Sequence, residues 1–385
     1  MKKVLATILA LVMALGLTTA AWADDAGVAC SGENCNHAAE FNGKHYASLV
    51  DAYAALTRGT TKPTTAQVIT LLKNSSGGGI GSDTDTNMNY VIDFNGYTYT
   101  AGAPTVGSPG TITQALRVLQ SSTAKFMNGT FKAANYNGLV QVVHTYGDVT
   151  FENFNVDARD SYAQIAVEPD CGTLNINGNS SILAREGMTG LYVAFWHTGT
   201  YNGTTVNVNT TGKITGKLVY EFDEDMTGDA AATENRAVLN IANGNFEITG
   251  IQTLFSGVAN EALKEAKIEV SGGTFSTDVT EYLAEGNILQ KNGDTYTAVT
   301  NSGITSGTYT AKPTVPDGYK VVENTDGTFT VEKVGGYYYY QPTTDTKTTD
   351  TKGSPKTFDA GIALYVGMAL TSAAGVAFVG KKRED

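Results

Sequence analysis

The chain has 385 residues, enough for one large or two modest domains, and its formal net charge is −12. Because such an acidic surface repels phosphate backbones, nucleic acid is excluded as an expected partner. The 43 glycines and 20 tyrosines, together with only 8 prolines, favour strands and turns over helices.

The N-terminus has the pattern of an export signal. Lys2 and Lys3 precede an apolar stretch over residues 4–17, and a small residue, Ala23, ends the segment. We predict a signal peptide over 1–23, cleaved between Ala23 and Asp24. An uncleaved anchor is the alternative, but the apolar stretch is short for a membrane span.

Two cysteines follow the predicted cleavage site. Cys30 and Cys35 lie five residues apart, so a local disulfide is a candidate in an exported protein. His37 raises the question of a zinc site, but His45 is the only further ligand within reach, and we expect none. Cys171 is expected to be a small buried residue.

A short helix and a strand come next. Tyr46, Leu49, Tyr53 and Leu56 share one helical face, which predicts a helix over 46–56 that covers one end of the fold. A strand is predicted over residues 68–72.

A repeated pattern fills the body of the chain: two alternating apolar residues, a short Asn/Gly corner, and one or two more apolar residues. The first strands of successive copies begin at Val149, Leu174, Val206, Leu239 and Ile268. A repeat of about thirty residues built from short, bent strands is typical of a parallel β-helix, in which each coil stacks on the last. A β-sandwich with Asn-Gly hairpins is the alternative, but its strands normally run longer between turns.

The order of these features resembles a known kind of exported protein. His37, the 41–43 turn, the short alanine-rich helix, the strand at 68–72 and the corner at Asn95-Gly96 resemble Gram-positive surface proteins with pectate-lyase-like β-helices. The resemblance covers about residues 30–300 and implies an all-β, right-handed parallel β-helix with an N-terminal capping helix. We therefore assign 24–277 to a β-helix with its cap.

The segment after the repeats is predicted to be a small β-hairpin module over 278–334. Residues 278–284 favour a short helix, and central turns at Asn292-Gly293 and Asp326-Gly327 predict two hairpins. A Tyr/Thr-rich linker is expected over 335–357.

The C-terminus has the pattern of an anchor. An uncharged run over 360–380 is long enough to span a membrane, and Lys381, Lys382 and Arg383 follow it, so 358–385 is predicted to be a transmembrane helix with a basic tail. The preceding pentapeptide resembles the L-P-x-T-G sorting signal of Gram-positive surface proteins, although its first and last residues differ; it comprises Ser354, Pro355, Lys356, Thr357 and Phe358. The resemblance implies a sortase-like transpeptidase as partner and a place on the cell wall or plasma membrane. The alternative is a plain, uncut membrane anchor.

Candidate chemistry is sparse. Asp157, Arg159 and Asp160 form the best catalytic constellation, yet a loop ion pair is the simpler interpretation. His144 stands without an apparent partner. No catalytic residue and no cofactor is therefore expected.

Two further groups of residues are candidates for binding. Asp223, Asp225 and Asp229 are weak calcium candidates, and a solvated loop is the default for them. Trp196 is a candidate glycan contact.

The sequence therefore predicts a surface-anchored, adhesin-like protein that binds glycans or a host surface. The alternatives are a polysaccharide lyase or glycoside hydrolase acting on acidic polysaccharide, and a passive surface coat.

Overall fold

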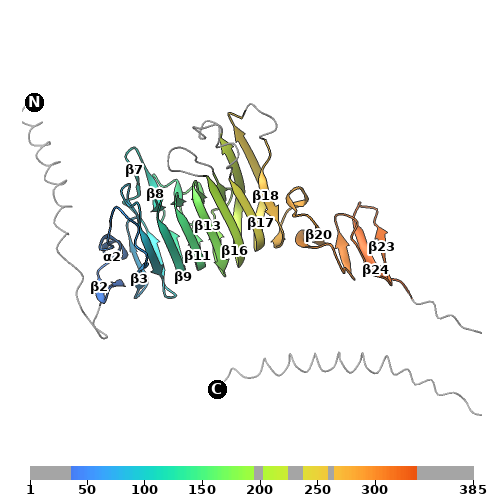
Figure 1. The fold of residues 1–385 in the computed structure, drawn as a ribbon, viewed down its shortest axis with the longest axis horizontal. Coiled ribbons are helices and arrows are strands. Elements are labelled where there is room, and N and C mark those ends of the chain that lie inside the picture. The colour runs from blue at the N-terminus through green and yellow to red at the C-terminus, as the bar shows by residue number, and fades with distance from the viewer. Residues whose placement is uncertain (1–35, 195–202, 224–236, 259–263, 336–385) are drawn as a thin grey trace, which may run out of the picture. The chain divides into compact units, whose positions relative to one another are not determined.

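The computed structural model describes residues 36–194, 203–223, 237–258 and 264–335, and nearly all of its regular structure is β-strand (Figure 1). The chain divides into two compact units, Met1–Val334 and Gly335–Asp385, and only Gly335 of the second is among the described residues. The elements are β1 (Ala39–Phe41), β2 (Lys44–Tyr46), α2 (Leu49–Ala54), β3 (Gln67–Leu71), β4 (Ser75–Gly77), β5 (Asn89–Asp93), β6 (Thr98–Ala101), β7 (Val106–Ser108), β8 (Thr111–Val118), β9 (Thr123–Ala133), β10 (Gln141–Thr145), β11 (Asp148–Asp157), β12 (Ile165–Pro169), β13 (Gly172–Gly178), β14 (Ser181–Leu183), β15 (Thr189–Val193), β16 (Thr204–Asp223), β17 (Val238–Ser256), β18 (Lys267–Val270), β19 (Thr274–Phe275), η4 (Thr280–Tyr282), β20 (Asn287–Asn292), β21 (Thr295–Thr300), β22 (Gly307–Tyr309), β23 (Tyr319–Glu323) and β24 (Phe329–Lys333).

The predicted repeat is confirmed as a parallel ladder of strands. Its five starting residues pair in register, each with the next: Val149 with Leu174, Leu174 with Val206, Val206 with Leu239, and Leu239 with Ile268. This first ladder runs through β3, β5, β9, β11, β13, β16, β17 and β18. The parallel direction of these pairings is the opposite of what the antiparallel hairpins of a β-sandwich require.

Two further parallel ladders lie beside the first. The second ladder joins β4, β6, β9, β11, β14, β16, β17 and β19. The third ladder joins β8, β10, β12, β15, β16 and β17. Long strands such as β16 take part in all three ladders, so a single strand joins one ladder to the next.

The predicted Asn/Gly corners are confirmed by the backbone. Asn95, Asn128 and Asn153 have positive φ of 51°, 56° and 52°, and Gly178 has a φ of 64°. Asparagine and glycine tolerate this left-handed conformation, which turns the chain from the first ladder into the second within very few residues.

A continuous apolar core runs along the ladders. Phe126 on β9 packs its ring against Tyr90, Phe151 and Phe154, with ring centroids 6.0, 6.2 and 5.6 Å apart. All four side chains are at most 1% exposed. Since each ring contacts rings from neighbouring coils, no coil completes its core alone.

The N-terminal end of the first ladder is covered. β1 pairs antiparallel with both β2 and β3, and α2 packs beside them, with Leu49 and Tyr53 buried. Ser48 begins the helix, because its hydroxyl accepts a hydrogen bond of 3.1 Å from the amide of Asp51. The helix expected over 46–56 is therefore present, though shorter.

The segment after the ladders forms the two predicted hairpins, β20–β21 and β23–β24. The short helix predicted over 278–284 is present only as the three-residue 3-10 helix η4. Leu283 leaves the turn with an extended backbone and forms a parallel bridge with Val270, which ends any helix there. β21 pairs antiparallel with β19 and so joins the hairpins to the second ladder.

The fold is all-β, and α2 is its one α-helix among the described residues. No helix in that part of the chain is long and apolar enough to cross a membrane. The predicted transmembrane segment at 358–385 lies outside the described residues, as do the signal peptide and the linker from residue 336 onward.

Candidate functional site

Several predicted site residues lie outside the described part of the chain. They are Ala23 and Asp24, Cys30 and Cys35, Trp196, Asp225 and Asp229, the side chain of Asp223, and the sorting-like residues 354–358.

The predicted constellation after β11 forms ion pairs. The guanidinium of Arg159 donates to both carboxylate oxygens of Asp157, at 2.9 and 2.8 Å, and Asp160 accepts from Lys132 at 2.7 Å. Burial raises the pKa of the Asp157 carboxyl, but the hydrogen bonds and charge of Arg159 outweigh it, so this pKa lies below its usual range. Both carboxylates are thus occupied by basic side chains, as a structural loop pairing requires.

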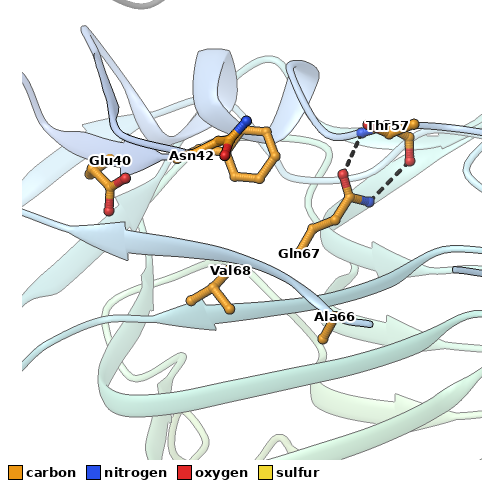
Figure 2. Close-up of a pocket in the computed structure, with 7 residues that line it drawn as sticks. Glu40, Asn42, Thr57, Ala66, Gln67 and Val68 are labelled. Carbon is orange, nitrogen blue, oxygen red and sulfur yellow. Dashed lines mark hydrogen bonds between the residues drawn. The ribbon is translucent and has the colours of Figure 1, made fainter. Parts of the chain in front are cut away.

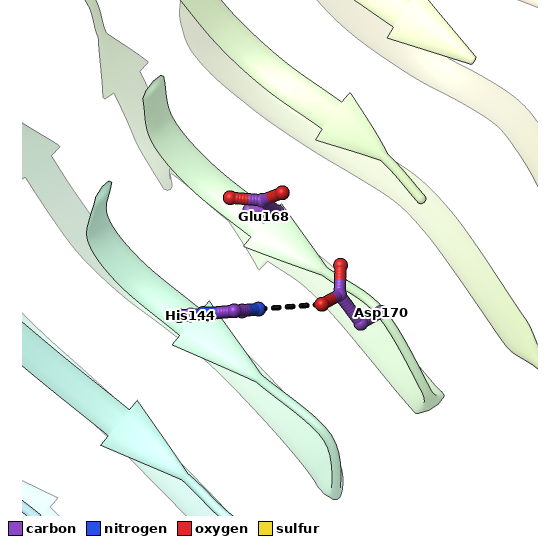
Figure 3. A group of neighbouring side chains, drawn as sticks. All are labelled: His144, Glu168 and Asp170. Carbon is purple, nitrogen blue, oxygen red and sulfur yellow. Dashed lines mark hydrogen bonds and ion pairs between the residues drawn. The ribbon is translucent and has the colours of Figure 1, made fainter. Parts of the chain in front are cut away.

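A different cluster of titratable side chains lies on the third ladder. His144 on β10 pairs in register with Glu168 on β12, and Asp170 follows β12 by one residue (Figure 3). His144 Nε2 lies 2.6 Å from Asp170 Oδ2, and one ligand atom from each of the three residues lies within 4.8 Å of the others. His144 and Asp170 are 6% and 7% exposed.

The strand alternation explains why these side chains meet. Val143 and Val167, each one residue earlier, pair with one another and are fully buried in the core. Successive side chains of a strand point to opposite faces, so His144 and Glu168 lie on the outer face of the third ladder. Asp170, two residues after Glu168, returns to that face.

Aromatic and basic side chains surround the cluster. The ring of Tyr146 lies 4.6 Å from that of His144, and the Arg117 guanidinium carbon lies 5.6 Å from the centre of the Tyr146 ring. On the next coil, the Tyr192 hydroxyl donates a hydrogen bond of 2.5 Å to Glu221. Aromatic, acidic and basic groups therefore converge on this outer face.

Burial and mutual charge shift the proton affinities of the cluster. Burial opposes the charged form of His144, but the neighbouring carboxylate of Asp170 outweighs it and raises the pKa of the imidazole. Burial, reinforced by the charge of Asp170, raises the pKa of Glu168 to about 7. Burial also raises the pKa of Tyr146 far above its ordinary value, with the charge of Asp170 acting in the same direction.

Several polar atoms of the cluster are buried without a hydrogen-bond partner among the described residues. They are His144 Nδ1, Glu168 Oε2 and Asp170 Oδ1. Buried polar groups are nearly always satisfied, so three unsatisfied atoms in one cluster point to a missing partner.

The predicted repeat covers only the strands of the first and second ladders, so the sequence did not point to this cluster on the third ladder. An alignment of the third-ladder strands would have revealed the cluster, because residues 141–146 lie opposite residues 165–170 in the register of β10 and β12. That alignment places His144 beside Glu168 and Tyr146 beside Asp170.

His37 and His45 lie closer than their separation in the sequence suggested. The antiparallel pairing of β1 and β2 brings their rings to a centroid distance of 6.4 Å. Cys30 and Cys35, which were considered with these histidines as zinc ligands, lie outside the described residues.

Two surface hollows are lined by described residues. The first, of about 470 Å³, lies between β1 and β3 (Figure 2). Of its polar side chains, Gln67 is hydrogen-bonded to the backbone of Thr57 at 2.7 and 3.1 Å, and Glu40 accepts a hydrogen bond of 2.6 Å from the amide of Gly43, so these groups are already engaged.

The second hollow, of about 310 Å³, lies on the outer side of successive coils. It is lined by Thr211, Asn243, Gly244, Asn245 and Thr274, which come from β16, β17 and β19. Hydroxyl and carboxamide groups dominate this lining.

A polar row runs along the outside of the first ladder. Asn207 donates a hydrogen bond to Asn175, and Asn240 donates one to Asn207, both at 2.9 Å. The same side chain thus recurs at the same place on three successive coils.

No protein-family model, curated protein or solved structure matches this chain.

Proposed function

We propose that the protein is a right-handed parallel β-helix anchored at the cell surface, where its outer face binds glycans. The observation that carries this proposal is the repetition of polar groups at equal positions on successive coils, seen in the row Asn175, Asn207 and Asn240. Neighbouring strands are about 4.8 Å apart, so a polymer with a regular repeat can meet the same group several times.

The polar hollow beside that row supports the same function. The carboxamides of Asn243 and Asn245 and the hydroxyls of Thr211 and Thr274 offer both donors and acceptors, which sugar hydroxyls require. An acidic chain with an open, polar hollow suits neutral glycans better than phosphorylated ligands.

A glycan array with the full-length chain tests this proposal. We expect binding to a repeating glycan that weakens when Asn243 and Asn245 are both changed to Ala. The matched control is Lys320→Ala, which removes an exposed side chain on β23, outside the three ladders. No binding above background, or equal binding by the double variant, would contradict the proposal.

The anchoring part of the proposal rests on the order of pentapeptide, uncharged run and basic tail at the C-terminus. We propose that a sortase-like enzyme cuts after Thr357 and joins the chain to the cell wall. Mass spectrometry of wall digests should then find a chain ending at Thr357. Recovery only of a chain intact through Asp385, in the membrane fraction alone, would instead favour a plain membrane anchor.

A second candidate function is hydrolysis of an acidic polysaccharide. The observation that favours it is the meeting of two carboxyl groups, Glu168 and Asp170, with oxygens within 4.8 Å of one another. A separation of at most 4.8 Å between these oxygens is below the range of inverting glycosidases and is compatible with the shorter spacing, roughly 5 Å, of retaining ones. Release of reducing ends from pectin, abolished by Glu168→Gln but retained by Asp157→Ala, would establish it; the absence of turnover would exclude it.

A further inference from the structure

The His144–Glu168–Asp170 cluster has the composition of a metal site. One imidazole and two carboxylates supply nitrogen and oxygen ligands from β10 and from β12 with the residue after it; His144 and Asp170 point toward one another, and Glu168 lies beside them (Figure 3). Zinc and related ions are bound in proteins by such mixed sets of ligands.

The distances need little adjustment for a metal. Bonds of about 2.0–2.2 Å to zinc place the ligand atoms of a tetrahedral site on the order of 3.3 Å apart. The ligand atoms lie within 4.8 Å of one another, and the His144–Asp170 pair at 2.6 Å must open slightly. A bound cation replaces the proton that joins this pair, and that proton leaves to solvent.

The unsatisfied atoms are an independent observation that points to a ligand. His144 is 6% exposed and Asp170 is 7% exposed, yet Asp170 Oδ1 and Glu168 Oε2 have no hydrogen-bond partner among the described residues, and the neighbouring Tyr146 hydroxyl and Gln141 carboxamide bear on these carboxyl groups without satisfying those two atoms. A cation between the carboxylates would compensate for the desolvation of these oxygens.

The ligand types also select among metals. Calcium takes six to eight oxygen ligands, whereas this cluster offers an imidazole and two carboxylates. Three protein ligands leave the fourth position of a tetrahedral ion open to water or to a substrate oxygen. The ring of Tyr146 lies against His144 and limits the motion of that ligand.

We propose that His144, Glu168 and Asp170 bind one divalent transition-metal ion of the zinc type on the outer face of β10 and β12. This site is distinct from the calcium candidates at 223–229, and it does not depend on the proposed glycan binding.

The test is metal retention by the full-length chain. The protein is stripped with a chelator, dialysed against limiting Zn²⁺ and analysed for bound metal, in parallel with the variants Glu168→Gln and Asp170→Asn. We expect one Zn²⁺ per wild-type chain at this site, and Zn²⁺ affinity lower by about tenfold or more in each single variant. Asp157→Asn, which alters a buried carboxylate paired with Arg159 on the same stack of coils, is the matched control and should bind as wild type does.

Two further measurements keep the test decisive. Far-ultraviolet circular dichroism checks that each variant is folded. If Asp170→Asn is unfolded, the result for Glu168→Gln decides, because this change leaves the His144–Asp170 hydrogen bond in place. The visible spectrum of the Co²⁺-loaded chain should show tetrahedral nitrogen and oxygen ligation that Glu168→Gln alters. Equal Zn²⁺ in the wild type and in a variant that carries both Glu168→Gln and Asp170→Asn would overturn the proposal and assign the metal elsewhere, for example to His37 and His45.

Discussion

Replacing Phe126 by alanine tests the idea that an aromatic core joins successive coils. Phe126 lies on β9, which pairs with β5 on one side and β11 on the other. Its side chain is fully buried and contacts the rings of Tyr90, Phe151 and Phe154.

The expected loss follows from these contacts. Truncating a buried phenylalanine to alanine costs about 3–5 kcal/mol, since the cavity left behind adds to the lost transfer energy. Aromatic pairs contribute about 0.5–1.5 kcal/mol beyond the area they bury, and three such pairs are lost here. We therefore expect a loss of about 4–5 kcal/mol, a large share of the stability of a typical domain.

Urea unfolding followed by circular dichroism measures this loss as a shift in the midpoint. Phe126→Leu keeps most of the volume and should lose clearly less. The matched control is Ile112→Ala on β8, because Ile112 is 53% exposed and its truncation should cost less than about 0.5 kcal/mol. A loss for Phe126→Ala below about 1 kcal/mol, or equal to that of the control, would refute the role of this ring in joining the coils.

Three further changes test other contacts of the stack. Gly212→Ala should destabilise the protein by about 2 kcal/mol or more in thermal unfolding, because the added methyl overlaps the carbonyl oxygen of Ser180. The control is Gly335→Ala, whose added methyl has no atom within 4 Å and should leave the stability unchanged. Asn207→Ala removes both bonds of the asparagine row and should cost about 1–2 kcal/mol in urea; a midpoint equal to wild type would show that the row adds no stability. The pKa of Asp157 is lower in the folded chain than in the unfolded chain, where it is near 4, so its ionised form adds stability above about pH 4. This stability is lost as the pH falls through the folded pKa. Asp157→Asn should therefore flatten the acid side of a plot of unfolding free energy against pH. Parallel acid profiles for Asp157→Asn and wild type would contradict this assignment.

The first ladder could be predicted from the sequence because its signal is apolar and periodic. Val149, Leu174, Val206 and Leu239 each begin a short alternating strand, and burial of one face leaves a single register for them. The corners were equally clear, since Asn and Gly adopt positive φ at little cost.

The candidate site could not be predicted in the same way. His144, Glu168 and Asp170 lie on the outer face, where no apolar period marks the register, and their meeting depends on how the third ladder aligns. The helix at 278–284 is shorter than predicted for a related reason, because Leu283 forms the parallel bridge to Val270 instead of continuing the helix.

The antiparallel pairings at the two extremities of the stack have a consequence for how such a protein can change in length. β1 pairs along the outer edge of β3, and β21 pairs along the outer edge of β19, so the first ladder at one end and the second ladder at the other do not present an unpaired strand edge to another molecule. Repeats can therefore be inserted in the interior by duplication without changing either of these pairings, whereas deletion of β1 should expose the edge of β3 and promote end-to-end association.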